Sequence, residues 1–112
     1  MDNKEIKRSL IRNARYTVRI NTHDSDYFAQ ILTNILFREY GTANPETLHP
    51  RPDMKRAGFS YRYDGSYSIL YGPLSKRERI DRVATKAVKS YTRRKKEKPR
   101  FVSREVKSSI MI

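Results

Sequence analysis

A stretch of alternating apolar and polar residues around an Asp-Gly pair constrains the fold of this chain more than any other feature. The stretch covers residues 58–72, and its apolar members are Phe59, Tyr61, Tyr63, Tyr67, Ile69 and Tyr71. Alternation with a period of two is typical of β-strands, and an Asp-Gly pair between two such runs favours a tight turn. The sequence therefore predicts an antiparallel β-hairpin, whose apolar face must pack on another layer.

The length of the turn decides which side chains share a face of this hairpin. A two-residue turn at Asp64-Gly65 would pair Tyr63 with Ser66 and divide the aromatic residues between the two faces. A three-residue loop ending at Gly65 would instead pair Arg62 with Ser66. It would gather five residues on one face, namely Phe59, Tyr61, Tyr67, Ile69 and Tyr71. We expect the three-residue loop, because it leaves the serines and Arg62 together on a polar face.

Two segments have the residue spacing of amphipathic helices. In residues 24–40 the apolar positions recur every three or four residues, as Phe28, Ile31, Leu32, Ile35 and Leu36. An aspartate before this stripe and a glycine after it supply the expected helix caps. A second helix is predicted over residues 75–93, where Ser75 and Glu78 have the spacing of a capping box. Its apolar stripe is Ile80, Val83, Ala84, Ala87, Val88 and Tyr91.

These elements, together with a strand predicted at residues 16–21, give the chain an α+β fold. We expect a small antiparallel sheet with the β-hairpin packed on the two main helices. The order strand, helix, hairpin, helix also allows a ferredoxin-like βαββα(β) arrangement. The spacing of Ile6, Leu10 and Ala14 predicts a further short helix at the N-terminus.

A length of 112 residues is typical of one domain. This α+β domain is expected to cover residues 1–93, including an irregular, proline-containing connection over residues 42–57. Residues 94–112 are expected to form a basic extension that is partly ordered or a tail. A last short strand over residues 100–106 is the ordered alternative.

The positive charge of the chain is concentrated in its C-terminal third. The formal net charge is +13, from 25 Lys and Arg against 12 Asp and Glu. Residues 76–100 hold twelve basic and three acidic residues, whereas residues 23–75 hold five and six. A charge gathered in this way attracts a polyanion, and each neutralised phosphate releases counterions. The pattern does not distinguish DNA from RNA, or single strands from duplexes.

We therefore expect a nucleic-acid-binding surface on the second helix and the residues after it. The expected phosphate contacts are Lys76, Arg79, Arg82, Lys86, Lys89, Arg93, Arg94, Lys95 and Lys96. Secondary contacts are expected from Arg8, Arg12 and Arg19. Unpaired bases stack on aromatic rings, and the rings that could serve here are Tyr61, Tyr67 and Tyr71. The alternative is that these rings form the core against the first long helix.

Residue types that carry catalysis or hold metals are scarce in this sequence. There is no Cys, and His23 and His49 stand at no spacing typical of a metal site or a catalytic triad. Helix capping accounts for the two carboxylates beside His23, Asp24 and Asp26. We expect a non-enzymatic protein without metal or cofactor. No apolar run exceeds three residues, so we also expect a soluble, cytoplasmic protein without a membrane partner.

The opening of the chain resembles the start of small phage-encoded type II anti-CRISPR proteins. The resemblance lies in Ile11-Arg12, in Tyr16-Thr17-Val18-Arg19-Ile20 and in Asp24-Ser25, where that family has a short helix, a strand and an Asp-Ser turn. It covers under a quarter of the chain. The anti-CRISPR protein is acidic and imitates DNA, whereas this chain is basic. The resemblance therefore implies a class and not a mechanism: a compact mobile-element protein that blocks a nucleic-acid machine by binding it.

Two functions from different classes follow from these patterns. The first is a non-enzymatic nucleic-acid-binding protein that contacts phosphates with its basic helix and C-terminal extension. The alternative is a small phage or mobile-element inhibitor, or an accessory factor, that docks on a nucleic-acid enzyme or a nucleoprotein complex.

Overall fold

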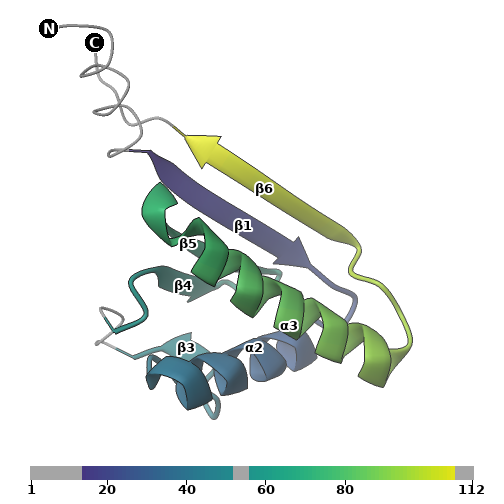
Figure 1. Cartoon of the computed structure of the whole chain (residues 1–112). Helices are drawn as coiled ribbons and strands as arrows, with labels where there is room; N and C mark the ends of the chain where they lie inside the picture. Colours follow the sequence, from purple (N-terminus) through teal and green to yellow (C-terminus); the bar gives the residue numbers. More distant parts are fainter. Residues whose placement is uncertain (1–13, 52–55, 108–112) are drawn as a thin grey trace, which may run out of the picture.

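The structure, a computed structural model, describes residues 14–51 and 56–107 of the chain (Figure 1). Within these ranges the elements are β1 (Arg15–Asn21), α2 (Ser25–Tyr40), β2 (Ala43–Asn44), β3 (His49–Pro50), β4 (Ser60–Tyr63), β5 (Tyr67–Pro73), a 3-10 turn (Leu74–Lys76), α3 (Arg77–Lys95) and β6 (Phe101–Lys107). The short N-terminal helix expected around Ile6 and Leu10 lies outside the described residues.

Four of the strands form an antiparallel sheet in the order β4-β5-β1-β6. Each long helix connects two strands that have a third strand between them: α2 leads from β1 to β4 around β5, and α3 leads from β5 to β6 around β1. This is the strand order of the ferredoxin-like arrangement, and the expected α+β fold is confirmed. The connection expected to be irregular contains a small separate sheet of β2 and β3.

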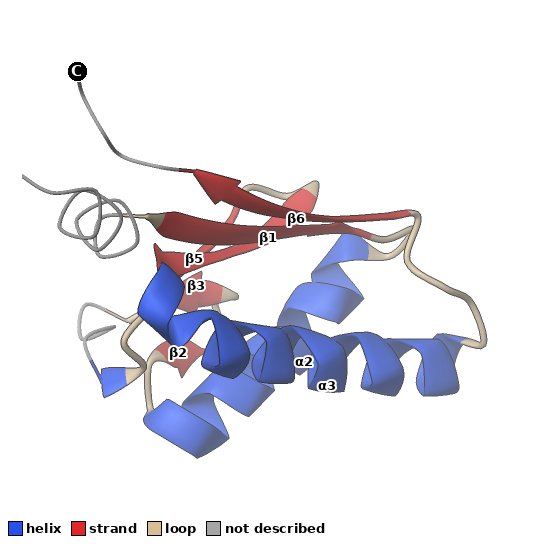
Figure 2. Ribbon diagram, turned by 45° about the horizontal axis from the view of Figure 1, so that its top comes forward, coloured by secondary structure: helices blue, strands red, loops and turns tan. Residues whose placement is uncertain are grey.

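Both helices lie on the same side of the sheet (Figure 2). The side chains of β1 alternate between the two sides of the sheet. Tyr16, Val18 and Ile20 are buried toward the helices, whereas Arg15 and Arg19 are exposed on the opposite side. The helices complete the core with residues at the predicted spacing, chiefly Phe28, Leu32, Leu36, Ile80, Val83, Ala87 and Tyr91. The sheet therefore divides the molecule into a helix face and an open face.

The first helix begins and ends as the sequence predicts. The carboxylate of Asp24 accepts a hydrogen bond of 3.1 Å from the amide of Tyr27, and Gly41 ends the helix with a φ of 68°. Glycine adopts this left-handed backbone without the steric penalty of a side chain.

The second helix begins differently from the prediction. Ser75 lies within the 3-10 turn, so it does not cap a helix with Glu78, and α3 begins at Arg77 without a side-chain cap. The chain entering this turn is still held by the sheet, because the amide of Leu74 donates to the carbonyl of Ala14 at 3.0 Å. The capping box expected here is therefore wrong.

The register of the β4–β5 hairpin also differs from the expected one. Tyr63 pairs with Ser68 and Arg62 with Ile69, so four residues, 64–67, separate the last pair of the hairpin, and the last of them, Tyr67, already belongs to β5 through its pairing with β1. The carboxylate of Asp64 shapes this loop by accepting bonds from the amides of Ser66 and Tyr67, each 2.9 Å long. The three-residue loop is thus a wrong prediction.

This register divides the aromatic residues between the two faces of the sheet. Tyr61 and its partner Leu70 are buried toward the helices, whereas Tyr67, Ile69 and Tyr71 lie on the open face. A single face that holds all the aromatic residues does not exist. The two-residue turn considered as the alternative assigns the faces correctly, although its pairing is shifted by two residues along the return strand.

The last strand is an integral part of the sheet. β6 pairs with β1 from Arg15 opposite Lys107 to Asn21 opposite Phe101. The strand considered for residues 100–106 is therefore observed, and the described part of the expected extension belongs to the fold. Residue 93, where we expected the domain to end, falls inside α3.

Candidate nucleic-acid interface

Five basic residues form one continuous stripe along α3. They recur at intervals of three and four, which places them on one side of a helix, and they are Arg79, Arg82, Lys86, Lys89 and Arg93. From the first to the last the stripe is about 21 Å long at a rise of 1.5 Å per residue. The stripe faces α2, because Lys86 and Arg82 bond to side chains near the end of that helix.

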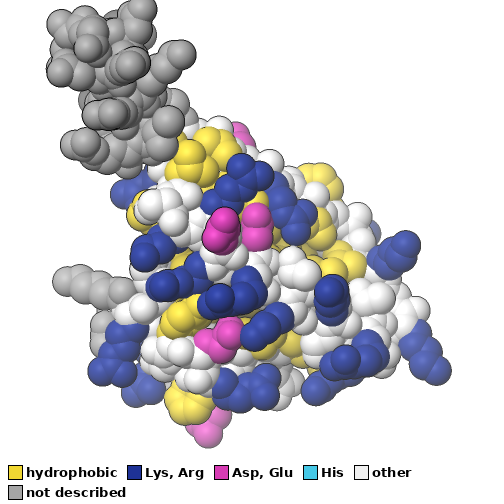
Figure 3. Space-filling model, viewed as in Figure 1, with side chains coloured by type: hydrophobic (Ala, Val, Ile, Leu, Met, Phe, Trp, Pro, Cys, Tyr) yellow, Lys and Arg dark blue, Asp and Glu magenta, His cyan; other side chains and the backbone are white. Residues whose placement is uncertain are grey.

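A groove with a volume of about 610 Å³ runs between α2 and α3 beside the stripe. Its lining residues are Ile31, Asn34, Ile35, Arg38, Lys86, Lys89, Ser90, Arg93 and Arg94. The two isoleucines belong to the buried core and form an apolar floor, and the cations stand on both rims. Figure 3 views the helix face and shows Lys and Arg side chains spread across it with few carboxylates between them.

Four cations that line the groove have no acidic partner among the described residues. Lys89, Arg93 and Arg94 form no ion pair there, and Arg38 on the α2 rim forms none. All four side chains belong to exposed residues. The groove therefore presents a cluster of positive charge that the described part of the molecule does not neutralise.

The other members of the stripe are held by neighbouring groups. Lys86 forms an ion pair of 2.8 Å with Glu39, and Arg82 donates to the hydroxyl of Tyr40 at 2.8 Å. Arg79 donates to a backbone carbonyl in the segment before β4 at 2.8 Å, and its guanidinium lies 5.5 Å from the ring centroid of Tyr40. These three side chains fasten α3 to its surroundings and have less capacity left for a ligand.

The predicted basic residues at the two ends of α3 lie outside the groove and have different surroundings from the groove cations. At the C-terminal end, Lys95 lies 3.0 Å from the carboxylate of Asp24 and 4.6 Å from the ring centroid of Tyr27. The hydrogen bond between Lys95 and Asp24 lowers the pKa of Asp24 and raises the pKa of Lys95. Lys96 follows in left-handed backbone, exposed and without a partner among the described residues. At the other end Lys76, in the 3-10 turn, is only partly exposed.

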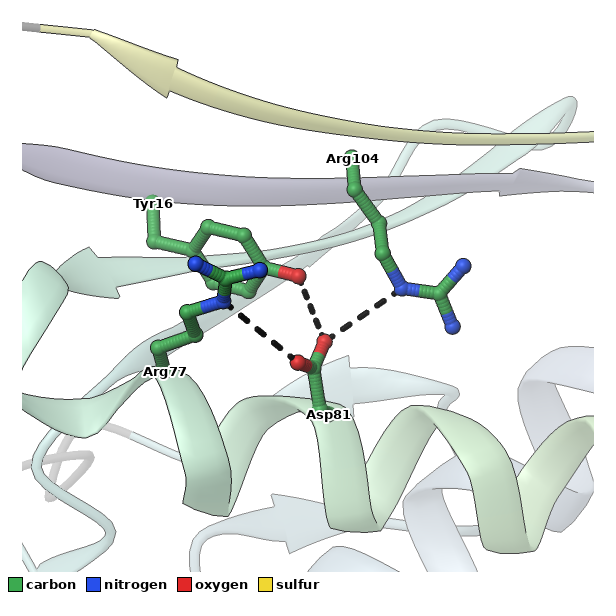
Figure 4. Close-up of polar contacts among 4 residues, drawn as sticks. All are labelled: Tyr16, Arg77, Asp81 and Arg104. Carbon is green, nitrogen blue, oxygen red and sulfur yellow. Dashed lines mark hydrogen bonds and ion pairs between the residues drawn. The ribbon is translucent and has the colours of Figure 1, made fainter.

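Two further arginines, Arg77 on α3 and Arg104 on β6, share one carboxylate (Figure 4). Asp81 accepts a hydrogen bond of 2.5 Å from the hydroxyl of Tyr16, and its oxygens lie 3.8 Å from Nε of Arg77 and 3.4 Å from Nε of Arg104. Burial, and after it the bond to Asp81, raises the pKa of Tyr16. This cluster joins α3 to β1 and β6, so its role is to position the helix on the sheet.

The structure does not bring all the predicted contact residues to one surface. Arg19 lies on the open face, on the opposite side of the sheet from α3, where its guanidinium is 5.6 Å from the ring centroid of Tyr67. Arg8 and Arg12 lie outside the described residues. Tyr61 is 2% exposed and its hydroxyl donates to the carbonyl of Leu48, so it belongs to the core, as the packing alternative has it.

Three residues on these surfaces are not among the contacts predicted from the sequence: Arg38, Arg62 and Phe101. Arg38 follows the apolar stripe of α2 and could have been placed beside the groove from its helical spacing to Ile31 and Ile35. Arg62 and Phe101 are exposed on the open face, and only the register of the strands shows that they share it.

Neither a metal site nor a membrane-spanning helix is found within residues 14–51 and 56–107. No group of three His, Cys, Asp or Glu residues in these ranges could hold a metal ion. Asp24 caps α2 and pairs with Lys95, and Asp26 accepts a hydrogen bond from the hydroxyl of Tyr63. No described helix is long and apolar enough to cross a bilayer.

Comparisons with protein-family models, with curated proteins and with solved structures gave no match. The resemblance of the opening residues to anti-CRISPR proteins thus stays a prediction.

Proposed function

We propose that this chain is a non-enzymatic nucleic-acid-binding protein whose helix face contacts phosphates. The observation that carries the proposal is the unneutralised cluster on the groove, formed by Lys89, Arg93 and Arg94 with Arg38 on the opposite rim. A polyphosphate is the partner that such a cluster binds most readily, because it supplies regularly spaced negative charge.

Two physical effects favour this partner. The like charges on one helix end repel one another, and a bound phosphate removes that repulsion. Each phosphate that Lys or Arg neutralises also releases condensed counterions, which adds a favourable entropy term at moderate salt. The guanidinium groups of Arg93 and Arg94 can further donate two parallel hydrogen bonds to one phosphate.

α3 also holds its cations rigidly in place before a ligand binds. Its residues at intervals of three and four hold the cations in a row, and the bonds of Arg82 and Lys86 to α2 fix the wall of the groove. A preformed row loses less side-chain entropy on binding than cations on an unstructured segment would lose.

The test is the salt dependence of binding to a short labelled duplex. Changing Lys89→Ala, Arg93→Ala and Arg94→Ala together is expected to reduce the slope of log K against log salt by about two to three. The matched control removes the same charge from the open face by Arg15→Ala, Arg19→Ala and Arg62→Ala, and should change the duplex slope by less than about one. Equal losses in both variants would contradict a specific role for the groove.

A second candidate is a small inhibitor or accessory factor that docks on a nucleic-acid enzyme or nucleoprotein. The apolar floor of the groove favours it, because Ile31 and Ile35 beneath a basic rim suit an acidic amphipathic segment of a protein. Capture from lysate after nuclease treatment separates the two candidates. A protein partner that stays bound to the chain, and is lost with the groove variant, supports the second.

A further inference from the structure

The open face of the sheet carries its own set of aromatic and basic side chains. In Figure 2 the described helices all lie on the other side of the sheet, and no described element covers this one. Paired residues on neighbouring strands of a sheet point to the same side, so the register assigns the members of the face. They include Arg15, Arg19, Arg62, Tyr67, Ile69, Tyr71, Phe101, Glu105 and Lys107.

Two of the large apolar side chains most exposed in the described structure belong to this face. Tyr71 on β5 is 41% exposed and Phe101 on β6 is 53% exposed. Tyr67 is partly exposed and lies in one row with Phe101, because both residues pair with Asn21 of β1, which lies between them. Ile69, between Tyr67 and Tyr71 along β5, is 5% exposed and closes the surface between the rings.

The charge of the face is positive and interleaved with the rings. Arg62 on β4 and Arg19 on β1 flank Ile69 in one row of the sheet. Glu105 is the one carboxylate on the described open face, and it pairs with Lys107 at 3.8 Å. Arg15 and Arg62 form no ion pair with described residues. Rings and guanidinium groups thus alternate from one row of this face to the next.

We propose that this open face binds single-stranded nucleic acid, with unpaired bases stacked on Tyr71 and Phe101 and phosphates held by Arg19 and Arg62. The inference rests on the proposed function and deepens it by naming the form of nucleic acid that this second surface takes. It concerns residues on the opposite side of the sheet from the groove, so the two surfaces can be tested separately.

The chemistry of the face selects single strands over duplexes. A duplex presents phosphates and groove edges, and its base faces are covered by their neighbours, so aromatic rings on a flat sheet find no base to stack on. An unpaired base offers its whole face, and stacking on an aromatic ring is tolerant of sequence because every base has such a face. Guanidinium groups beside the rings add stacking and cation–π contacts as well as charge.

The experiment compares two single-stranded probes of equal length and charge, oligothymidine and the same sugar-phosphate chain without bases. At one fixed salt concentration, the natural chain is expected to bind oligothymidine about 10- to 100-fold more tightly than the abasic chain. The variant with Tyr71→Ala and Phe101→Ala should bind the two probes within about threefold of each other. Tyr71→Phe, which keeps the ring, should retain most of the preference.

The groove variant separates failure of this inference from failure of the proposed function. Lys89→Ala, Arg93→Ala and Arg94→Ala should weaken binding of both probes while leaving their ratio unchanged. If the ratio is already close to one for the natural chain, or survives in the Tyr71→Ala, Phe101→Ala variant, stacking on the open face is overturned even though the groove still binds phosphate. If neither probe binds, the proposed function fails as well. Thermal unfolding of each variant confirms that the fold is retained.

Discussion

Both sides of the sheet are basic, but different kinds of residue surround the cations on each side. On the helix face the free cations border a groove with an apolar floor and stand among carboxylates such as Glu39 and Asp24, which hold Lys86 and Lys95. On the open face the arginines stand among exposed aromatic rings. We therefore propose phosphates as the ligand of the helix face, and phosphates together with bases as the ligand of the open face.

The comparison also shows that the number of cations in a segment says little about how many are free to bind. Of the α3 residues, Arg77, Lys86 and Lys95 have carboxylate partners, whereas Arg93 and Arg94 have none among the described residues. Lys86 and Lys95 join α3 to α2 and to its N-cap residue, whereas Arg77 pairs with Asp81 one turn further along α3. The unpaired cations remain for a ligand.

The largest difference in stability is expected between substitutions of two tyrosines of the same hairpin, Tyr61 and Tyr71, which lie on opposite sides of the sheet. Tyr61→Ala should lower the free energy of unfolding by about 3 to 5 kcal/mol, because it removes a buried ring from the core. Tyr71→Ala should lower it by less than about 1 kcal/mol, because that ring is already 41% exposed. Unfolding in denaturant measures both, and similar losses would contradict the register of β4 and β5.

A smaller effect is expected at the carboxylate that fastens α3 to the sheet. Asp81→Ala should lower the free energy of unfolding by about 1 to 2 kcal/mol, because the hydroxyl of Tyr16 loses its hydrogen-bond partner. Glu105→Ala on the open face is the control, since its ion pair with Lys107 is solvent-exposed and should contribute less than about 0.5 kcal/mol. Equal destabilisation would show that the cluster in Figure 4 does not anchor the helix.

The smallest effect concerns Asp24, which holds Lys95 away from a ligand. Asp24→Asn keeps a residue that caps helices well but frees the ammonium group, so duplex affinity should rise roughly two- to fivefold. The pKa of Asp24 is lowered in the folded state, chiefly by its bond to Lys95. Its contribution to stability is therefore present above its pKa in the unfolded chain and is lost as the pH falls through the lower, folded value.

That contribution should be less than about 1 kcal/mol, because the side chain of Asp24 is 43% exposed and its charge is screened by solvent. Thermal unfolding of the natural chain and of Asp24→Asn, measured between neutral and strongly acidic pH, should therefore converge as the pH falls. A constant difference across this range would mean that the carboxylate charge has no part in it.

Local patterns predicted the elements of this fold, and long-range contacts decided the rest. The helix from Ser25 to Tyr40 follows from its own cap, its apolar spacing and the glycine that ends it. The hairpin was also predictable from its alternation, but its register was not, because the side chain of Asp64 and the burial of Tyr61 together select the longer loop.

The candidate site was predictable to the same extent. The basic stripe on α3 follows from helical spacing within one segment, and its place beside α2 does not. Arg19 was assigned to the same surface as α3 because charge was counted along the chain, whereas the alternation of β1 sends it through to the other side of the sheet. Which cations are free also depends on partners distant in sequence, as Lys86 and Glu39 show.

The pairing of β1 with β6 has a practical consequence for attaching this protein to a surface or to a fusion partner. Arg15 lies opposite Lys107, so the chain enters and leaves the sheet at the same corner. The last turns of α3 lie toward the opposite end of β1, where Lys95 meets Asp24 just beyond that strand. A tether attached at Arg15 or at Lys107 would thus be anchored away from the groove cations, so immobilised protein should keep its helix face accessible.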